Sequence, residues 1–383
     1  MKKIGLAIIV ILLAAASIFF GVLPQRFDRN ANVVIPHDPY VISEEAQSLH
    51  DTIPVADLHS DMLLWRRNPA KKNARGHTDV PRLREGGVAL QVFTAVTKSP
   101  SGLNYDENDA STDDLNLLTF AQLWPRRTWN SIYERAAYQA ERLHKLEKTA
   151  PDEFVFVKSA PDLNKALDRG ALAGIYGIEG AHPLEVELEN IDRLYDQGLR
   201  IMGLQHFFDN ALGGSLHGKS GAGLTEFGKA AVDRAVAKGM IIDLAHSSEQ
   251  VAWDVLARID EPVIVSHTGM KGHCDTARNI PDDLMKAIAD AGGLVGIGFW
   301  DAAVCDPSPE GIADALLYAV EHLGVDHVAL GSDFDGTVTT PIDGSEMAAL
   351  TQALLDKGAD AATIRAVMGE NAIRFFRENL PAR

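Results

Sequence analysis

Eight short apolar runs recur along the chain, and they constrain the fold more than any other feature. The runs show no alternation of apolar and polar residues, which is typical of strands buried on both faces of a parallel sheet. Helical patterns separate most of them, as parallel crossovers require. The chain is therefore predicted to be an α/β protein with a (β/α)8 TIM barrel. The predicted strands are Val55–Leu58, Ala89–Ala95, Leu172–Ile178, Arg200–Gln205, Met240–Ala245, Pro262–Ser266, Leu294–Phe299 and His327–Gly331.

The segments between the runs carry helix start and stop signals. Acidic residues, Ser, Thr or Pro open the predicted helices, and Gly follows several of them. These helices are Leu188–Gln197, Thr225–Lys238, Ser247–Ile259, Pro281–Ala291 and Pro309–Leu323. The chain of 383 residues with 46% hydrophobic content can bury a large core, and one barrel domain over residues 48–383 is predicted.

Three segments exceed a minimal barrel. Lys98–Thr149 is predicted to be an insertion that begins as a loop and continues as helix, with Pro125 as a break. Phe154–Val157 predicts a small additional strand, and Ser345–Lys357 and Ala361–Asn379 predict terminal helices.

Residues 1–25 form a separate apolar segment. Lys2 and Lys3 precede an uncharged run from Ile4 to Pro24, which is long enough to span a bilayer. A signal peptide cleaved near Ala14–Ala16, which would release the protein, is the alternative; the apolar run continues past that point, which favours an uncleaved anchor. The lysines predict a cytoplasmic N-terminus with the remainder outside. Residues 26–47, which are polar at first and contain Pro36 and Pro39, predict a linker.

The net charge and the number of cysteines exclude some classes of function and of structural site. The formal charge of −17 argues against nucleic-acid binding, which needs a basic surface. Cys274 and Cys305 are too few for a disulfide framework or a Cys-rich zinc site. A single bond between them in an oxidising compartment is possible, but two unpaired residues are expected.

Ionisable residues stand at the ends of six predicted strands, on the face where barrel active sites lie. Burying so many of them is too costly unless they are paired or bind metal. His59 and Asp61, two positions apart, point the same way if the strand continues through them. The full set is His59, Asp61, Glu179, His182, His206, His246, His267, Asp333 and Asp335.

Two metal ions fit this set better than one. His59, Asp61, His246 and His267 with a bridging Glu179 give each ion about three protein ligands and leave a position for a shared water. Ligation rich in imidazole and bridged by carboxylate suits zinc, so two Zn²⁺ are predicted. Asp335 and His182 are expected beside the ligands rather than among them.

The motifs at these strand ends resemble the membrane dipeptidase, or renal dipeptidase, family of zinc metallopeptidases. They are HSD at 59–61, IEGAH at 178–182, DLAHSS at 243–248, SHTG at 266–269 and GSDFDG at 331–336, with CDTARNIPDD at 274–283. The resemblance covers about residue 48 to the C-terminus. It implies a di-zinc dipeptidase that attacks the peptide bond with a metal-bridging hydroxide.

The resemblance also implies roles for three further residues. His206 matches the family's substrate-polarising histidine, Arg278 the arginine that holds the substrate carboxylate, and Asp333 the acid that handles the proton. These roles suit the chemistry of an imidazole donor, a planar guanidinium fork and a carboxylate base. The expected substrate is a dipeptide with a free C-terminal carboxylate.

The same residues allow two alternative functions. Another binuclear amidohydrolase, acting on a lactone, amide or D-amino-acid derivative, would often bridge its metals with a carboxylated lysine; the third predicted strand ends in Glu179 instead. A non-catalytic, membrane-tethered binding protein would lack a ligand or Asp333, and none is missing. The N-terminal segment suits a bacterial protein on the periplasmic side of the cell membrane. The family resemblance leaves a homodimer open, and the physiological dipeptide is not predicted.

Overall fold

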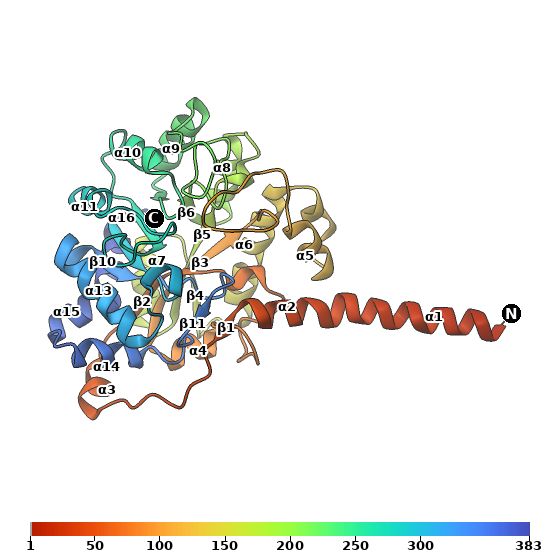
Figure 1. Ribbon diagram of the computed structural model, residues 1–383, viewed down its shortest axis with the longest axis horizontal. Coiled ribbons are helices and arrows are strands. Elements are labelled where there is room, and N and C mark those ends of the chain that lie inside the picture. Colours follow the sequence, from red (N-terminus) through yellow and green to blue (C-terminus); the bar gives the residue numbers. More distant parts are fainter. Residues whose placement is uncertain (1) are drawn as a thin grey trace.

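The computed structural model describes residues 2–383 as a barrel from which one long helix projects (Figure 1). Within these residues, nine parallel strands form one sheet, and eight of them close into a ring because β3 pairs with β5 and β10 with β2. The (β/α)8 prediction is confirmed. The ring strands are β2 (Val55–Ser60), β3 (Val88–Val96), β5 (Leu172–Glu179), β6 (Leu199–Gly203), β7 (Ile241–Asp243), β8 (Ile264–Thr268), β9 (Leu294–Ile297) and β10 (Val328–Leu330).

All eight predicted strands are present with small differences at their ends. Every residue of the ring strands except Ala89 is buried, which explains the absence of an alternating pattern. The small strand β4 (Phe154–Val157) also forms, outside the ring. It pairs with Leu172–Ile175 of β5, and β6 pairs with Tyr176–Ile178, so β4 and β6 share one edge of β5 in succession.

Helices cover the outside of the ring. Side-chain caps fix several starts: Thr225, Ser248 and Ser308 each accept a hydrogen bond from the backbone N–H three residues later. The helices between and before the strands are α3 (Glu44–His50), α4 (Val80–Glu85), α7 (Ala160–Asp168), α8 (Glu189–Asp196), α9 (Glu226–Ala237), α10 (Glu249–Leu256), α11 (Asp282–Asp290), α12 (Asp301–Val304) and α13 (Pro309–Leu323). Short 3-10 turns occur at Met62–Leu64, His182–Leu184 and Val325–His327.

The insertion and the C-terminus are helical, as predicted. The insertion contains α5 (Leu115–Ala121), a 3-10 turn (Arg126–Trp129) and α6 (Ile132–Thr149). The C-terminal helices are α14 (Ala348–Asp356), α15 (Ala361–Arg365) and α16 (Asn371–Asn379), with a π-turn (Ala366–Glu370) between the last two. Gly369 in that turn lies so close to β2 that an added Cβ would be 2.0 Å from the Pro54 carbonyl oxygen, so only glycine fits.

The N-terminal helix runs without a break from α1 (Lys2–Ser17) through a π-turn (Ile18–Val22) into α2 (Leu23–Ala31). It is long and apolar enough to cross a membrane, and its apolar part is exposed. The segment expected to be a linker is partly bound to the barrel: β1 (Val33–Val34) pairs with β11 (Thr339–Thr340), after β10. Backbone hydrogen bonds to a distant strand, which local composition does not reveal, explain this difference.

The expectation that the two cysteines stay unpaired is wrong. Cys274 and Cys305 form a disulfide, with their Cα atoms 5.6 Å apart. Cys274 follows β8 and Cys305 follows α12 after the neighbouring β9, so adjacent strands bring together residues separated by 31 positions. Such a bond is typical of an oxidising compartment.

Candidate metal centre and active site

Eight predicted site residues meet at the carboxyl end of the barrel. Each lies on or shortly after a strand, except Arg278, which lies in the loop after β8. All eight side chains belong to residues at most 8% exposed. They are His59, Asp61, Glu179, His206, His246, His267, Arg278 and Asp333.

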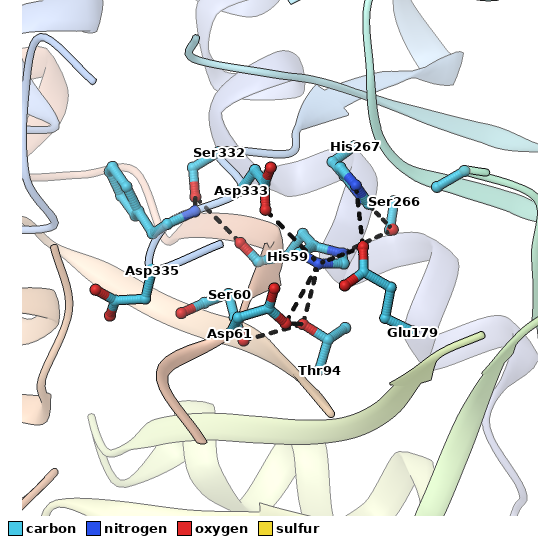
Figure 2. Close-up of polar contacts among 12 residues, drawn as sticks. His59, Ser60, Asp61, Thr94, Glu179, Ser266, His267, Ser332, Asp333 and Asp335 are labelled. Atoms are coloured by element: carbon cyan, nitrogen blue, oxygen red, sulfur yellow. Dashed lines mark hydrogen bonds and ion pairs between the residues drawn. The ribbon is translucent and has the colours of Figure 1, made fainter. Parts of the chain in front are cut away.

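Glu179, the last residue of β5, stands at the centre of the cluster. Its Oε1 lies 3.5 Å from Nε2 of His59, 3.1 Å from Nε2 of His246 and 3.3 Å from Nε2 of His267. Its Oε2 lies 3.3 Å from Nε2 of His206. Figure 2 shows the carboxylate between the imidazoles of His59 and His267 and the rest of the cluster, with dashed contacts to both rings. One carboxylate is thus shared by histidines from four other strands.

The His59 side of the cluster carries two more carboxylates. Nε2 of His59 lies 3.6 Å from Oδ1 of Asp61 and 3.9 Å from Oδ1 of Asp333. The Thr94 hydroxyl, from β3, donates to Oδ1 of Asp61 at 2.6 Å and so orients that carboxylate. Thr94 was not singled out in the sequence, because a threonine inside an apolar strand gives no local signal of a site.

Ser266 orients two of the imidazoles. Its Oγ lies 3.0 Å from Nδ1 of His59 and 3.0 Å from Nδ1 of His267. A hydroxyl oxygen can accept from both N–H groups, which leaves both Nε2 atoms with lone pairs directed at Glu179 (Figure 2). This tautomer is the one a metal ligand needs. The SHTG motif contained this serine, but only its contact with the distant His59 shows its role.

The donor set fits divalent cations. Nε2 of His246 lies 3.0 Å from Nε2 of His267 and 3.1 Å from Oε1 of Glu179, so an ion bound there would have two imidazole nitrogens and a carboxylate oxygen within reach. Three groups have all their ligand atoms within 4.8 Å of one another: His59–Asp61–Glu179, Glu179–His206–His246 and His59–His267–Asp333. Nitrogen and carboxylate donors without sulfur suit zinc and neighbouring divalent ions.

The electrostatics of the cluster also favour added positive charge. Burial raises the pKa of Glu179 well above its ordinary value, with Asp61 adding to the shift. Burial lowers the pKa of His246 and of His267 well below the ordinary value, which keeps both imidazoles neutral. At His59 burial opposes protonation, but Glu179 and Asp61 raise its pKa to about 10. The carboxylates around His59 therefore favour a positive charge at this position, and a bound metal ion would provide that charge.

Asp333 and Asp335 share one loop but have different surroundings. Burial raises the pKa of the Asp333 carboxyl to about 8, against the opposing effect of His59. Asp335 points away from the cluster (Figure 2), pairs with Arg67 at 2.7 Å and accepts from the Thr78 hydroxyl at 2.6 Å. Both have left-handed backbones, with φ of 59° and 66°, a conformation that is costly outside glycine and common at functional sites.

His206 and His182 follow neighbouring strands; His206 is buried, whereas His182 is partly exposed. Burial lowers the pKa of His206 to about 4, so its imidazole is neutral. His182 packs edge-on against Phe208 at 4.5 Å between ring centroids, and its two ring nitrogens have no hydrogen-bond partner. Among the described residues His182 belongs to none of the candidate metal groups, in keeping with the expectation that it lies beside the ligands.

Arg278 shares a cavity of about 570 Å³ with the metal cluster. Its guanidinium donates to the carbonyl oxygens of Ala245 (3.1 Å) and His267 (2.7 Å) and lies 5.4 Å from the Trp300 ring centroid. These contacts fix the guanidinium without neutralising it. The cavity is also lined by Asp61, Glu179, His206, His246 and Asp333. A ligand with an anionic end can therefore reach Arg278 and the metal cluster together.

The family model for membrane dipeptidase (peptidase family M19) matches residues 43–382. The chain belongs to the membrane dipeptidase family. As a member of this family it is a metallopeptidase, with the fold expected from the sequence. Residues 2–42, with α1, α2 and β1, precede the matched region.

Solved structures agree with the family assignment. The chain is 27% identical to the dipeptidase AC, an M19 metallopeptidase, with a TM-score of 0.70 and coverage of 87% of this chain and 100% of that one. It is 26% identical to a metallopeptidase from Rhodobacter sphaeroides liganded with a phosphinate mimic of L-Ala-D-Ala, with a TM-score of 0.71 and coverage of 86% and 99%. The probable dipeptidase PvdM from Pseudomonas aeruginosa shares the fold at 20% identity, with a TM-score of 0.74 and coverage of 88% and 98%.

Proposed function

We propose that the protein is a di-zinc dipeptidase that hydrolyses dipeptides with a free C-terminal carboxylate. The observation that carries the proposal is the position of Glu179. Its Oε1 lies within 3.5 Å of His59 on one side and within 3.3 Å of His246 and His267 on the other, in the cavity that contains Arg278. This arrangement suits a carboxylate shared by two ions, next to a group that binds an anion.

The ligands divide into two sets. His59 and Asp61 would hold one ion, His246 and His267 would hold the other, and Glu179 would serve both. The bound ions would supply an activated water and a Lewis acid for the peptide carbonyl. Thr94 and Ser266 support this assignment, because they orient Asp61, His59 and His267.

Three residues of the chain would act on the substrate. Asp333 takes a proton from the attacking water and passes it to the leaving amine, a role that suits a carboxylate whose pKa burial raises. His206 is neutral and donates an N–H to the carbonyl oxygen as negative charge develops there. Arg278 binds the C-terminal carboxylate through its planar fork.

The two alternatives have less support. Many binuclear amidohydrolases bridge their metals with a carboxylated lysine, whereas β5 ends in Glu179 and contains no lysine. A binding protein without catalysis would not require Asp333 beside His59 at 3.9 Å. The ligand of the Rhodobacter relative, a dipeptide mimic, supports a dipeptide substrate for this chain as well.

Activity on a panel of dipeptides tests the proposal. The purified protein, loaded with zinc, is expected to release free amino acids from L-L, L-D or D-D dipeptides. No hydrolysis of any free dipeptide by metal-loaded protein would contradict the proposed function. Hydrolysis of a β-lactam and of a lactone, measured in the same panel, tests the alternative that the protein is another kind of amidohydrolase.

Dipeptides with an amidated C-terminus are expected to be poor substrates. Loss of one partner of a buried charged pair costs about 2–5 kcal/mol, so kcat/KM should fall about 100-fold relative to the free acid. The Arg278→Lys variant should lose most of this preference, because it keeps the charge but not the planar fork. Equal rates on acid and amide would remove Arg278 from its assigned role.

We further infer that residues 1–25 stay attached as a membrane anchor, with the barrel on the periplasmic side. Lys2 and Lys3 favour a cytoplasmic N-terminus, and the Cys274–Cys305 bond suits an oxidising compartment. Phe19 and Phe20 pack on Phe120 of α5, with ring centroids 5.9 and 5.4 Å apart, so the end of the apolar helix contacts the barrel.

Cell fractionation is expected to find the intact chain in the membrane fraction. Protease added to spheroplasts should digest the barrel. N-terminal sequencing of the membrane-bound protein should read the residues that precede Ala14. A mature N-terminus near residue 17 with soluble protein would instead show cleavage of a signal peptide. Carbonate washing distinguishes a spanning helix from peripheral attachment.

A further inference from the structure

The helix α2 lies outside the region matched by the family model, yet it forms part of the active-site cavity. The family match begins at residue 43, whereas α2 covers Leu23–Ala31. Phe27 and Ala31 of α2 line the same cavity as Asp61, Glu179 and Arg278. Two residues in the wall of this cavity therefore come from a helix that lies outside the barrel domain.

A buried acid fixes α2 to the barrel. Asp28 is 2% exposed, and its Oδ2 lies 2.6 Å from Nε of Arg75 and 3.4 Å from Nε of Arg67. Arg67 in turn pairs with Asp335 at 2.7 Å. Because Asp335 lies two residues after Asp333, this chain of ion pairs connects α2 to the loop that carries the proposed proton carrier.

The segment after α2 is fixed as well. The Asn32 side chain donates to Asp28 at 3.0 Å and accepts from the backbone N–H of Thr337 at 3.0 Å. The pairing of β1 with β11 follows directly. Since α2 is held at both its middle and its end, its position relative to the cavity is set by the fold.

The contacts of Phe27 indicate which end of the cavity α2 covers. Its ring packs against Trp65, with centroids 5.8 Å apart, and Nε1 of Trp65 donates to the Asp335 carbonyl oxygen at 2.7 Å. Trp65 follows Asp61 by four residues. Arg278 instead packs against Trp300 and lies in the loop after β8. Phe27 thus adjoins the Asp61–Asp333 side of the cavity, away from the group proposed to hold the C-terminal carboxylate.

The surroundings of Phe27 are apolar. Leu64 and Trp65 after β2 and Leu115 and Leu118 of α5 line the cavity with it. Phe27 is 51% exposed, so part of its ring is free to be covered by a ligand. Covering such apolar surface stabilises a complex in proportion to the area removed from water.

We propose that α2, through Phe27, forms the binding surface for an apolar side chain on the amino-terminal residue of the dipeptide. The inference rests on the proposed dipeptidase function and adds the determinant of substrate preference. Phe27 acts here as a specificity residue: it contacts the substrate side chain and takes no part in proton transfer or metal binding.

The test compares Leu-Ala with Gly-Ala as substrates of the full-length, zinc-loaded protein in detergent. In the Phe27→Ala variant, kcat/KM for Leu-Ala should fall about tenfold through a higher KM, while kcat/KM for Gly-Ala should change less than twofold. Phe27→Leu should restore most of the preference. Leu23→Ala is the matched control, because Leu23 is an exposed apolar residue of the same helix that does not line the cavity.

The outcomes separate this inference from the proposed function. Wild-type protein that cleaves neither dipeptide would overturn both. Wild-type protein that cleaves both, with an unchanged Leu-Ala to Gly-Ala ratio in Phe27→Ala, would overturn only the role of α2. A shift that appears equally in Leu23→Ala, or for Ala-Leu against Ala-Gly, would also contradict it, since the effect would then not belong to Phe27 or to the amino-terminal residue.

Discussion

The Glu179→Ala variant is expected to lose metal and activity together. Glu179 is the only carboxylate in the described residues that contacts His59, His246 and His267 at once, so its removal takes a ligand from both proposed ions. Bound zinc, measured by atomic emission after gel filtration, should fall below two per chain. Dipeptidase kcat/KM should fall on the order of 10³-fold or more, since metal activation of water supplies several kcal/mol.

A matched control comes from the same segment of the chain. Glu187 follows the same strand but is exposed, and Glu187→Ala should retain both zinc and activity. A Glu179→Ala protein that keeps two zinc ions and wild-type turnover would show that the carboxylate does not bridge. Retention of one ion with loss of activity would still agree with a shared ligand.

The Asp333→Asn variant is expected to separate metal binding from turnover. Asparagine has nearly the same size as aspartate but cannot accept the proton of the attacking water at neutral pH. We expect zinc content and melting temperature close to the wild type, and kcat lower by about 10²- to 10⁴-fold, the usual contribution of a general base or acid. KM for the dipeptide should change little.

The control for this variant is Asp326→Asn. Asp326 lies before β10, at the opposite end of the strand that precedes Asp333, and its side chain is 68% exposed. This change should leave kcat unaltered. Full turnover by Asp333→Asn would remove its proposed role in proton transfer, and loss of zinc in that variant would make Asp333 a ligand instead.

Much of the barrel could be predicted because its strands are buried on both faces. A continuous apolar run such as Leu172–Ile178 is visible locally, and the structure places β5 at Leu172–Glu179. The ends of the strands were predicted less exactly. The strand predicted at Arg200–Gln205 is β6 (Leu199–Gly203) in the structure, because its pairing with β7 stops at Gly203. Pairing depends on the neighbouring strand, which composition does not contain.

Much of the candidate site was predictable for a related reason. In a parallel barrel every strand presents its carboxyl end at one rim, so polar residues at strand ends converge whatever their separation in sequence. His59 and His267 are 208 positions apart, yet their ring centroids lie 3.8 Å from each other. The residues at strand ends could thus be proposed from their positions, whereas Arg278, in the loop after β8, was proposed only from the family resemblance.

The sequence by itself determined the barrel, the polar rim and the family, because these follow from local periodicity and from residues at strand ends. Only the tertiary structure decided which distant groups meet: Ser266 between two imidazoles, Thr94 on Asp61, the bond between Cys274 and Cys305, and the seating of α2. Each of these depends on contacts formed when the ring closes. Such contacts leave no periodic or compositional trace along the chain, so they appear only in the folded molecule.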